Sequence, residues 1–73
     1  MNTLFISLFA DILNMEAHEI SLQDNFRTYE NWDSLAYLSV ISMMDEEFDI
    51  QIETNEFKKL VSVEDLINAV TNV

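Results

Sequence analysis

The sequence predicts an all-α fold, a small bundle of three main helices plus one short helix. Two observations support this prediction. The 73 residues include no glycine and no proline, whereas a fold rich in tight β-hairpins would need glycine at positive φ. Apolar residues also recur at helical spacing rather than in alternation. The chain has no cysteine, so disulfides cannot supplement the limited core of so small a domain.

The first helix is expected from Thr3 to Asn14, where six apolar residues recur at helical spacing. A long connection follows, residues 15–32, and its apolar side chains should hold it against the core. A connection of this length is uncommon in a small domain and is often functional. The six helical positions are Leu4, Phe5, Leu8, Phe9, Ile12 and Leu13, and the three apolar residues of the connection are Ile20, Leu22 and Phe26.

The second helix is expected from Ser34 to Phe48, with Asp33 as its N-cap. Trp32 just before the cap should pack on Tyr37 as a hydrophobic staple. A helical wheel separates a core face from an outer face, and it predicts that Leu35 and Met43 face water beside Ser34. The predicted core face holds Leu38, Val40, Ile41, Met44, Tyr37 and Phe48, and the outer face holds Leu35, Ala36, Ser39, Met43, Glu46 and Glu47.

Two further helices complete the prediction. A short one should cover residues 55–60, capped by Thr54, with Lys58 and Lys59 near its C-terminal end, where positive charge complements the helix dipole. The last should run from Val63 to Asn72. Its start, from Ser62 to Asp65, resembles a capping box with aspartate in place of the usual glutamate or glutamine.

Charge excludes several classes of function. Fourteen acidic residues face three basic ones, for a formal net charge of −11. This argues against binding to nucleic acid or to an anionic membrane surface. It favours a basic partner protein, although a solubilising surface would have the same charge. No apolar run approaches the ~20 residues of a membrane span, and the N-terminus lacks the positive region of a signal peptide. We expect one cytoplasmic, monomeric domain over residues 1–73.

Acidic residues concentrate over positions 45–56, at a helix C-terminus where the dipole disfavours them. A basic partner, a divalent cation or plain solvation would each be compatible with this run. The pattern matches neither an EF-hand loop, which needs glycine at its sixth position, nor a zinc site. We therefore expect no metal site.

Ser34 is the strongest candidate for a modified residue. It is expected at the first position of a helix, where backbone N–H groups and the helix dipole favour a phosphate. This position suits the attachment of a phosphate-linked prosthetic arm. His18 is the only histidine, and one histidine does not specify a triad with Ser34. We therefore expect a protein that presents a group rather than an enzyme.

The segment Asp33-Ser34-Leu35, the amphipathic helix ending Asp45-Glu46-Glu47-Phe48, and the continuation Asp49-Ile50-Gln51-Ile52 resemble the acyl carrier protein family. The resemblance extends over nearly the whole chain. It implies that Ser34, preceded by Asp33, carries 4′-phosphopantetheine installed by a phosphopantetheinyl transferase. An acyl group would ride on the arm as a thioester.

The resemblance also implies partners and contact residues. The partners would be acyl-activating or acyl-transferring enzymes with basic docking patches. Their contacts would lie along the second helix, at Leu35, Ala36, Ser39, Met43, Glu46 and Glu47. The acyl chain in this family can fold back between helices, and here the residues lining that space would be Leu38, Ile52, Phe57 and Leu60.

The chain departs from the family pattern at four positions. Asn31-Trp32 stands where fatty-acid-synthesis members usually have Gly-Ala or Gly-Leu, and Ala36 and Ser39 stand where they usually have acids. The pattern therefore resembles a specialised-pathway carrier more than the housekeeping one. Two other readings stay open: an aminoacyl or peptidyl carrier, and an acidic helical adaptor without a cofactor.

Overall fold

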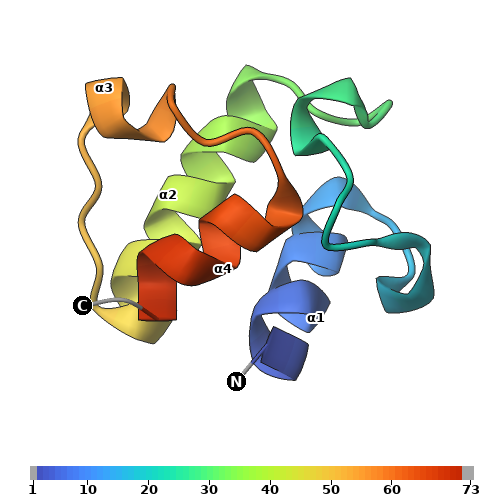
Figure 1. Ribbon diagram of the computed structural model, residues 1–73. Coiled ribbons are helices and arrows are strands. Elements are labelled where there is room, and N and C mark those ends of the chain that lie inside the picture. The colour runs from blue at the N-terminus through green and yellow to red at the C-terminus, as the bar shows by residue number, and fades with distance from the viewer. Residues whose placement is uncertain (1, 72–73) are drawn as a thin grey trace.

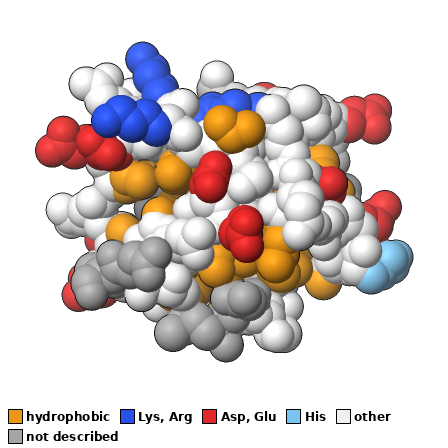
Figure 2. All heavy atoms as spheres, in the orientation of Figure 1, with side chains coloured by type: hydrophobic (Ala, Val, Ile, Leu, Met, Phe, Trp, Pro, Cys, Tyr) orange, Lys and Arg blue, Asp and Glu red, His pale blue; other side chains and the backbone are white. Residues whose placement is uncertain are grey.

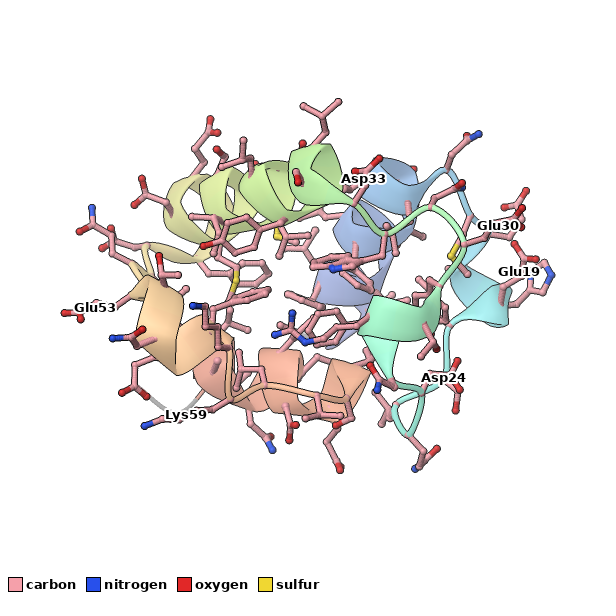
Figure 3. All side chains as sticks on the ribbon, turned by 90° about the horizontal axis from the view of Figure 1, so that it is seen from above. Glu19, Asp24, Glu30, Asp33, Glu53 and Lys59 are labelled. Carbon is pink, nitrogen blue, oxygen red and sulfur yellow. The ribbon has the colours of Figure 1, made fainter. Side chains whose placement is uncertain are left out.

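Helices account for the architecture of the described chain, residues 2–71, in the computed structural model (Figure 1). Figures 1 and 3 show α2 and α4 on opposite sides of the core, with α1 packed between them. The predicted all-α bundle is confirmed. The elements are α1 Asn2–Leu13, the 3-10 turns η1 Ala17–Glu19 and η2 Phe26–Thr28, α2 Ser34–Phe48, α3 Thr54–Phe57 and α4 Val63–Thr71.

The two long helices end at polar residues in the left-handed conformation, which explains how the chain turns without glycine. Asn14 and Asp49 both have φ of 56°, and Asn and Asp tolerate this region better than most residues. After α1, the Met15 N–H donates to the Ala10 carbonyl at 2.9 Å and the Asn14 N–H donates to Asp11 at 3.2 Å. These bonds satisfy carbonyls that the helix end would leave without partners.

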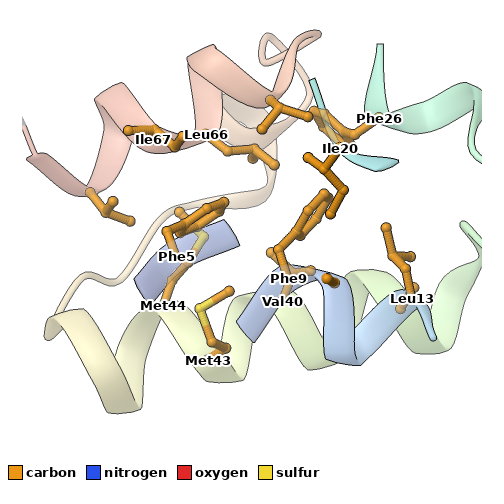
Figure 4. Packing of buried hydrophobic residues seen from close by; sticks show 14 of the residues in the cluster. Phe5, Phe9, Leu13, Ile20, Phe26, Val40, Met43, Met44, Leu66 and Ile67 are labelled. Atoms are coloured by element: carbon orange, nitrogen blue, oxygen red, sulfur yellow. The ribbon is translucent and has the colours of Figure 1, made fainter. Parts of the chain in front are cut away.

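The core joins side chains from all four helices and from the connection between α1 and α2, and Figure 4 shows most of them. Ile20 and Phe26 of that connection are buried, and Leu22 packs against the core half-buried, as predicted. The Tyr29 hydroxyl donates to the Asp24 carboxylate at 2.7 Å. Burial, with a smaller contribution from Asp24, raises the Tyr29 pKa to about 12. The buried residues that the helices contribute are Phe5, Phe9, Ala10, Leu13, Ala36, Val40, Met43, Met44, Phe57, Val63, Leu66, Ile67 and Val70.

The predicted core face of α2 differs from the observed one by part of a helical turn. Ala36 and Met43 were expected on the outer face but are buried, with 6% and 7% of their surfaces exposed. Leu38 was expected in the core but is 57% exposed. The reason is that α1 packs along the Ala36 and Met43 side of α2, whereas the sequence of α2 alone does not indicate which flank a neighbouring helix covers.

The short helix also differs from its prediction. Thr54 is its first residue and not its cap, Glu53 precedes it without a side-chain capping bond, and the helix ends at Phe57. The observed boundaries of α1 and α2 and the start of α4 agree with the predicted ones to within one residue. The predicted end of the last helix, Asn72, lies outside the described residues. No helix within residues 2–71 is long and apolar enough to cross a bilayer.

The predicted capping box at the start of α4 is confirmed. The Ser62 N–H donates to the Asp65 carboxylate at 3.1 Å, and the Asp65 N–H donates to the Ser62 hydroxyl at 3.1 Å. The Val61 N–H also donates to the Asp65 carboxylate, at 2.9 Å. The backbone bonds from Val61 and Ser62 lower the pKa of Asp65 below its ordinary value of 3.8.

Asp65 should therefore make the fold sensitive to acid. A carboxyl whose pKa is depressed by folding stabilises the fold above its unfolded pKa, and this contribution is lost as pH falls through the folded value. We expect the melting temperature of the native protein to exceed that of Asp65→Asn at pH 6, and the difference to shrink below pH 3.8. Thermal unfolding followed by circular dichroism measures this. A difference that stayed constant down to pH 2 would contradict the assignment.

Candidate functional site

The start of α2 presents Ser34 to solvent at the first position of the helix. Asp33 caps the helix, as predicted, because its carboxylate accepts from the Ala36 N–H at 2.8 Å. The Asp33 carbonyl accepts from the Tyr37 N–H at 2.9 Å and begins the helical hydrogen bonding. Figure 3 shows Asp33 at this end of α2. An exposed hydroxyl at a helix N-terminus suits a phosphate ester, since the N–H groups and the dipole favour an anion.

The two residues before the cap fix the position of this helix end. The Asn31 amide donates to the Leu13 carbonyl at 2.6 Å and so ties the segment to the end of α1. The Trp32 ring packs on Phe26 with a centroid distance of 4.8 Å and stacks on Phe57 at 6.2 Å. Asn31 and Trp32, which depart from the family pattern, therefore have structural roles here.

Trp32 and Tyr37 were expected to pack on each other as a staple, but both rings pack on Phe57 instead. Tyr37 meets Phe57 edge to face, with a centroid distance of 5.0 Å and an interplanar angle of 73°. Phe57 lies nearly parallel to Trp32 on the other contact, with an interplanar angle of 5°. The aromatic pair flanking the start of α2 is thus joined by a residue of α3, a contact that the local sequence does not reveal.

A groove follows the seam between α1 and α2. It consists of two adjoining hollows of about 390 and 430 Å³, both lined by Ile12 and Ser39. Leu35 and Leu38 line one hollow each and are 75% and 57% exposed. Acidic side chains line both hollows, namely Asp11, Glu30, Asp33, Glu46 and Glu47. The seam therefore offers two exposed leucines flanked by acidic side chains.

A third hollow, of about 410 Å³, lies on the other side of Ser34, between the start of α2 and α3. Tyr37 and Thr54 face each other across it, with 3.5 Å between their hydroxyl oxygens. Two basic residues line it, Arg27 and Lys58. Its remaining lining residues are Trp32, Asp33, Ser34 and Phe57. Ser34 thus stands between an acidic seam and a hollow with basic residues.

The structure brings some of the predicted contact residues together and separates others. Leu35, Ser39, Glu46 and Glu47 are exposed along the α1–α2 seam, whereas Ala36 and Met43 are buried, which contradicts their expected exposure. Met43 still lines the floor of one hollow. Buried Ala36 also explains one departure from the family pattern, since a carboxylate at that buried position would be costly.

The four residues expected to line an acyl space do not form one site. Phe57 is buried and lines the hollow beside α3. Leu38 lines the opposite hollow, against α1. Ile52 and Leu60 pack half-buried against the core. Leu38 thus lies apart from Phe57, and a contact of an acyl chain with these four residues stays a prediction.

Three residues near the site were missed in the sequence. Arg27 donates from Nη2 to the carbonyls of Phe57 and Leu60 at 2.9 and 3.0 Å, and so holds the end of α3 beside Ser34. Lys58 was expected only near the end of a helix, and no role in the site was expected for Asp11. Each reaches the site through contacts between residues far apart in sequence, for which the local pattern contains no signal.

No cluster of three or more histidine or acidic side chains that could hold a metal ion occurs within residues 2–71. His18 is exposed on η1. The chemistry that the site offers is a solvent-exposed hydroxyl, a helix N-terminus and two differently charged flanks.

The chain is similar to known proteins over most of its length. A family model described as a phosphopantetheine attachment site matches residues 4–70. The acyl carrier protein of Clostridium acetobutylicum is 36% identical over 61 residues, covering 84% of this chain and 79% of that protein. The acyl carrier protein of Kocuria rhizophila is 30% identical over 67 residues, covering 86% and 83%. That of Campylobacter lari is 24% identical over 75 residues, covering 93% and 97%.

Proposed function

We propose, since this chain belongs to the acyl carrier protein family and contains its phosphopantetheine attachment domain, that Ser34 is the residue that bears the 4′-phosphopantetheine arm. Proteins of this family are carriers and not catalysts. The observation that supports Ser34 is its exposed position at the start of α2, directly after the Asp33 cap. A phosphodiester on its hydroxyl would lie near the N–H groups of the first helical turn.

The bound arm would supply the thiol that holds the acyl group as a thioester. The chain has no cysteine, so no thiol of its own would compete for the cargo. The protein itself would hold the hydroxyl of Ser34 exposed and in a fixed position. Three contacts support this role: the Asp33 cap, the Asn31 bond to Leu13 and the packing of Trp32 on Phe26.

Incubation with coenzyme A and a broad-specificity phosphopantetheinyl transferase tests this proposal. Intact-mass spectrometry should show a gain of one phosphopantetheine on the native chain and on Ser42→Ala, a control at another exposed serine of α2. Ser34→Ala should show none, because it lacks the acceptor oxygen. A gain on Ser34→Ala would refute the assignment, and no gain on any variant with several transferases would favour the adaptor without a cofactor.

We also propose that enzymes with basic docking patches contact the α1–α2 seam. Leu35 and Leu38 are its exposed apolar residues, and Glu46 and Glu47 are acidic residues at its far end from Ser34. A partner with an apolar anchor and basic edges would complement this surface. The seam begins next to Ser34, so a docked enzyme would have the arm within reach.

Reversing one charge on the seam should slow the transfer reaction. We expect Glu46→Lys to lower kcat/KM for the phosphopantetheinyl transferase several-fold at low salt, because rim charges act mainly on association. The matched control is Glu64→Lys, which makes the same change at an exposed position of α4. At high salt, screening should make the kcat/KM values of the two variants similar. Equal losses for both variants at low salt would mean that only net charge matters.

We propose a specialised pathway rather than general fatty-acid synthesis. The support is exposed Ser39, which stands where fatty-acid-synthesis members usually have an acid. Ala36 gives no such support, because its burial already explains the absence of an acid there. Loading of the labelled protein by acyl-activating and by amino-acid-activating enzymes would separate an acyl cargo from an aminoacyl one.

A further inference from the structure

The first helix contributes one wall of the groove that it forms with α2. Leu8 and Ile12 line the hollow of about 430 Å³ from the α1 side, and both are half-buried. Leu4 is 49% exposed, and it lies one turn before Leu8 on the same flank of α1, because residues four apart share a helix face. The three side chains therefore form an aliphatic row, about 12 Å long at about 1.5 Å per residue.

This row lies beside the exposed leucines of α2, Leu35 and Leu38. The two helices are antiparallel: the Phe5 ring near the start of α1 lies 5.9 Å from the Phe48 ring at the end of α2, and the end of α1 lines a hollow with the start of α2. Such a grouping of exposed apolar residues is typical of an interaction surface. Of the four large apolar residues exposed within the described chain, three lie here, Leu4, Leu35 and Leu38, and the fourth, Val61, lies between α3 and α4.

The charged side chains along this groove are acidic. Asp11 on α1 and Glu46 and Glu47 on α2 line the hollow that holds Leu8 and Leu38. Neither hollow of the groove has a lysine or arginine among its described lining residues. Figure 2 shows Lys and Arg side chains gathered over and beside α3 instead. A ligand with an apolar face between positive edges would therefore complement the groove.

The shape and the charge of the groove together identify its occupant. Two antiparallel helices leave a furrow that a third helix fills with its apolar side chains. A second copy of this chain would bring a net charge of −11 to an acidic surface, and an anionic membrane would be repelled for the same reason. A helix of a partner protein, apolar on one face and rich in lysine or arginine beside it, meets neither obstacle.

We infer that the α1–α2 groove binds a single amphipathic, basic helix of a partner protein, and that α1 contacts this helix as well as α2. The apolar face of the bound helix packs on Leu4, Leu8 and Leu38, and its basic edges meet Asp11 on one side and Glu46 on the other. This inference rests on the docking proposed at the seam, but it needs no arm on Ser34.

A synthetic peptide of leucine and lysine, with leucines at helical spacing over about four turns, tests the inference. A scrambled peptide of the same composition has the same charge but no apolar face. The isotope-labelled native protein is titrated with each peptide and followed by NMR. We expect the first peptide to shift the amide signals of Leu8, Asp11 and Ile12 as well as those of α2. It should bind about tenfold more tightly than the scrambled one, because only it buries its leucines in the groove.

Two outcomes of the titration would overturn the inference: shifts confined to α2, or equal affinities for the two peptides. The proposed docking is tested separately by the transferase assay. If Glu46→Lys slows the transferase selectively and the peptide does not bind the groove, the inference fails and the docking proposal stands. If neither effect occurs, both fail.

Leu4→Ala and Val61→Ala form a matched pair for the apolar wall on α1, because each truncates a side chain that is 49% exposed. Leu4→Ala should weaken binding of the first peptide about threefold, since less apolar surface is buried in the complex. Val61→Ala should bind it as the native protein does. Thermal unfolding establishes that both variants fold. Equal affinities of the two variants would overturn the contact with Leu4.

Asp11→Lys and Glu64→Lys form the corresponding pair for charge, with Glu64 exposed on α4. A lysine near the end of α1 suits the helix dipole, so Asp11→Lys should fold. We expect it to weaken binding of the first peptide about fivefold at low salt, and Glu64→Lys to weaken it less than about twofold. Salt should reduce both effects. Equal losses in the two variants would overturn the contact with Asp11.

Discussion

Replacing Phe57 with alanine is expected to remove about 3–5 kcal/mol of stability, the usual cost of a Phe→Ala change in a core. Phe57 is 1% exposed. Its ring contacts three others, at centroid distances of 5.9 Å to Phe26, 6.2 Å to Trp32 and 5.0 Å to Tyr37. The cavity would therefore open at the centre of the aromatic cluster that holds α3 against the start of α2. Urea unfolding followed by circular dichroism measures the loss.

Leu35→Ala is the control for this prediction. Leu35 is 75% exposed, so its truncation should change stability by no more than about 0.5 kcal/mol. If Phe57→Ala is unfolded in water, Phe57→Leu leaves a smaller cavity and should give a measurable, intermediate loss. A stability of Phe57→Ala equal to that of Leu35→Ala would contradict the packing described for α3.

Replacing Arg27 with methionine is expected to cost about 2–3 kcal/mol. The change keeps an apolar stem but removes three hydrogen bonds, from Nε to Leu60 at 3.2 Å and from Nη2 to Phe57 and Leu60 at 2.9 and 3.0 Å. It leaves those carbonyls without their charged donor, and hydrogen bonds to charged groups are worth more than neutral ones. It also removes the cation from the faces of Phe26 and Phe57. Urea unfolding gives the free energy difference.

Lys59→Met is the matched control, because Lys59 lies close to the same end of α3 but makes only an exposed pair with Glu56. Such pairs contribute little, so a loss below about 1 kcal/mol is expected. Arg27→Lys should recover only part of the lost stability, since an ammonium lacks the planar set of donors. Equal losses for Arg27→Met and Lys59→Met would show that Arg27 does not hold α3 in place.

The local signals of the sequence were sufficient for the boundaries of the long helices and for the caps of α2 and α4. The boundaries of α2, the Asp33 cap and the Ser62–Asp65 capping box were all predicted, because capping depends on residues within one turn of each other. For the same reason the place of Ser34 at the start of α2 could be predicted from five residues.

The surroundings of Ser34 could not be predicted in the same way. The exposure of Met43 and Leu38 was assigned incorrectly because it depends on which flank of α2 is covered by α1. The role of Arg27 depends on carbonyls thirty and more residues away. The two flanks of Ser34, one acidic and one containing Lys58, come from helices distant in sequence.

The most direct test of the central claim is to locate the arm in the chain. The protein labelled by the transferase is digested, and tandem mass spectrometry of its peptides identifies the modified residue. We expect the phosphopantetheine mass on Ser34 and on no other hydroxyl. Its location on another serine, such as Ser39 or Ser42 of the same helix, would show that Ser34 is not the attachment point.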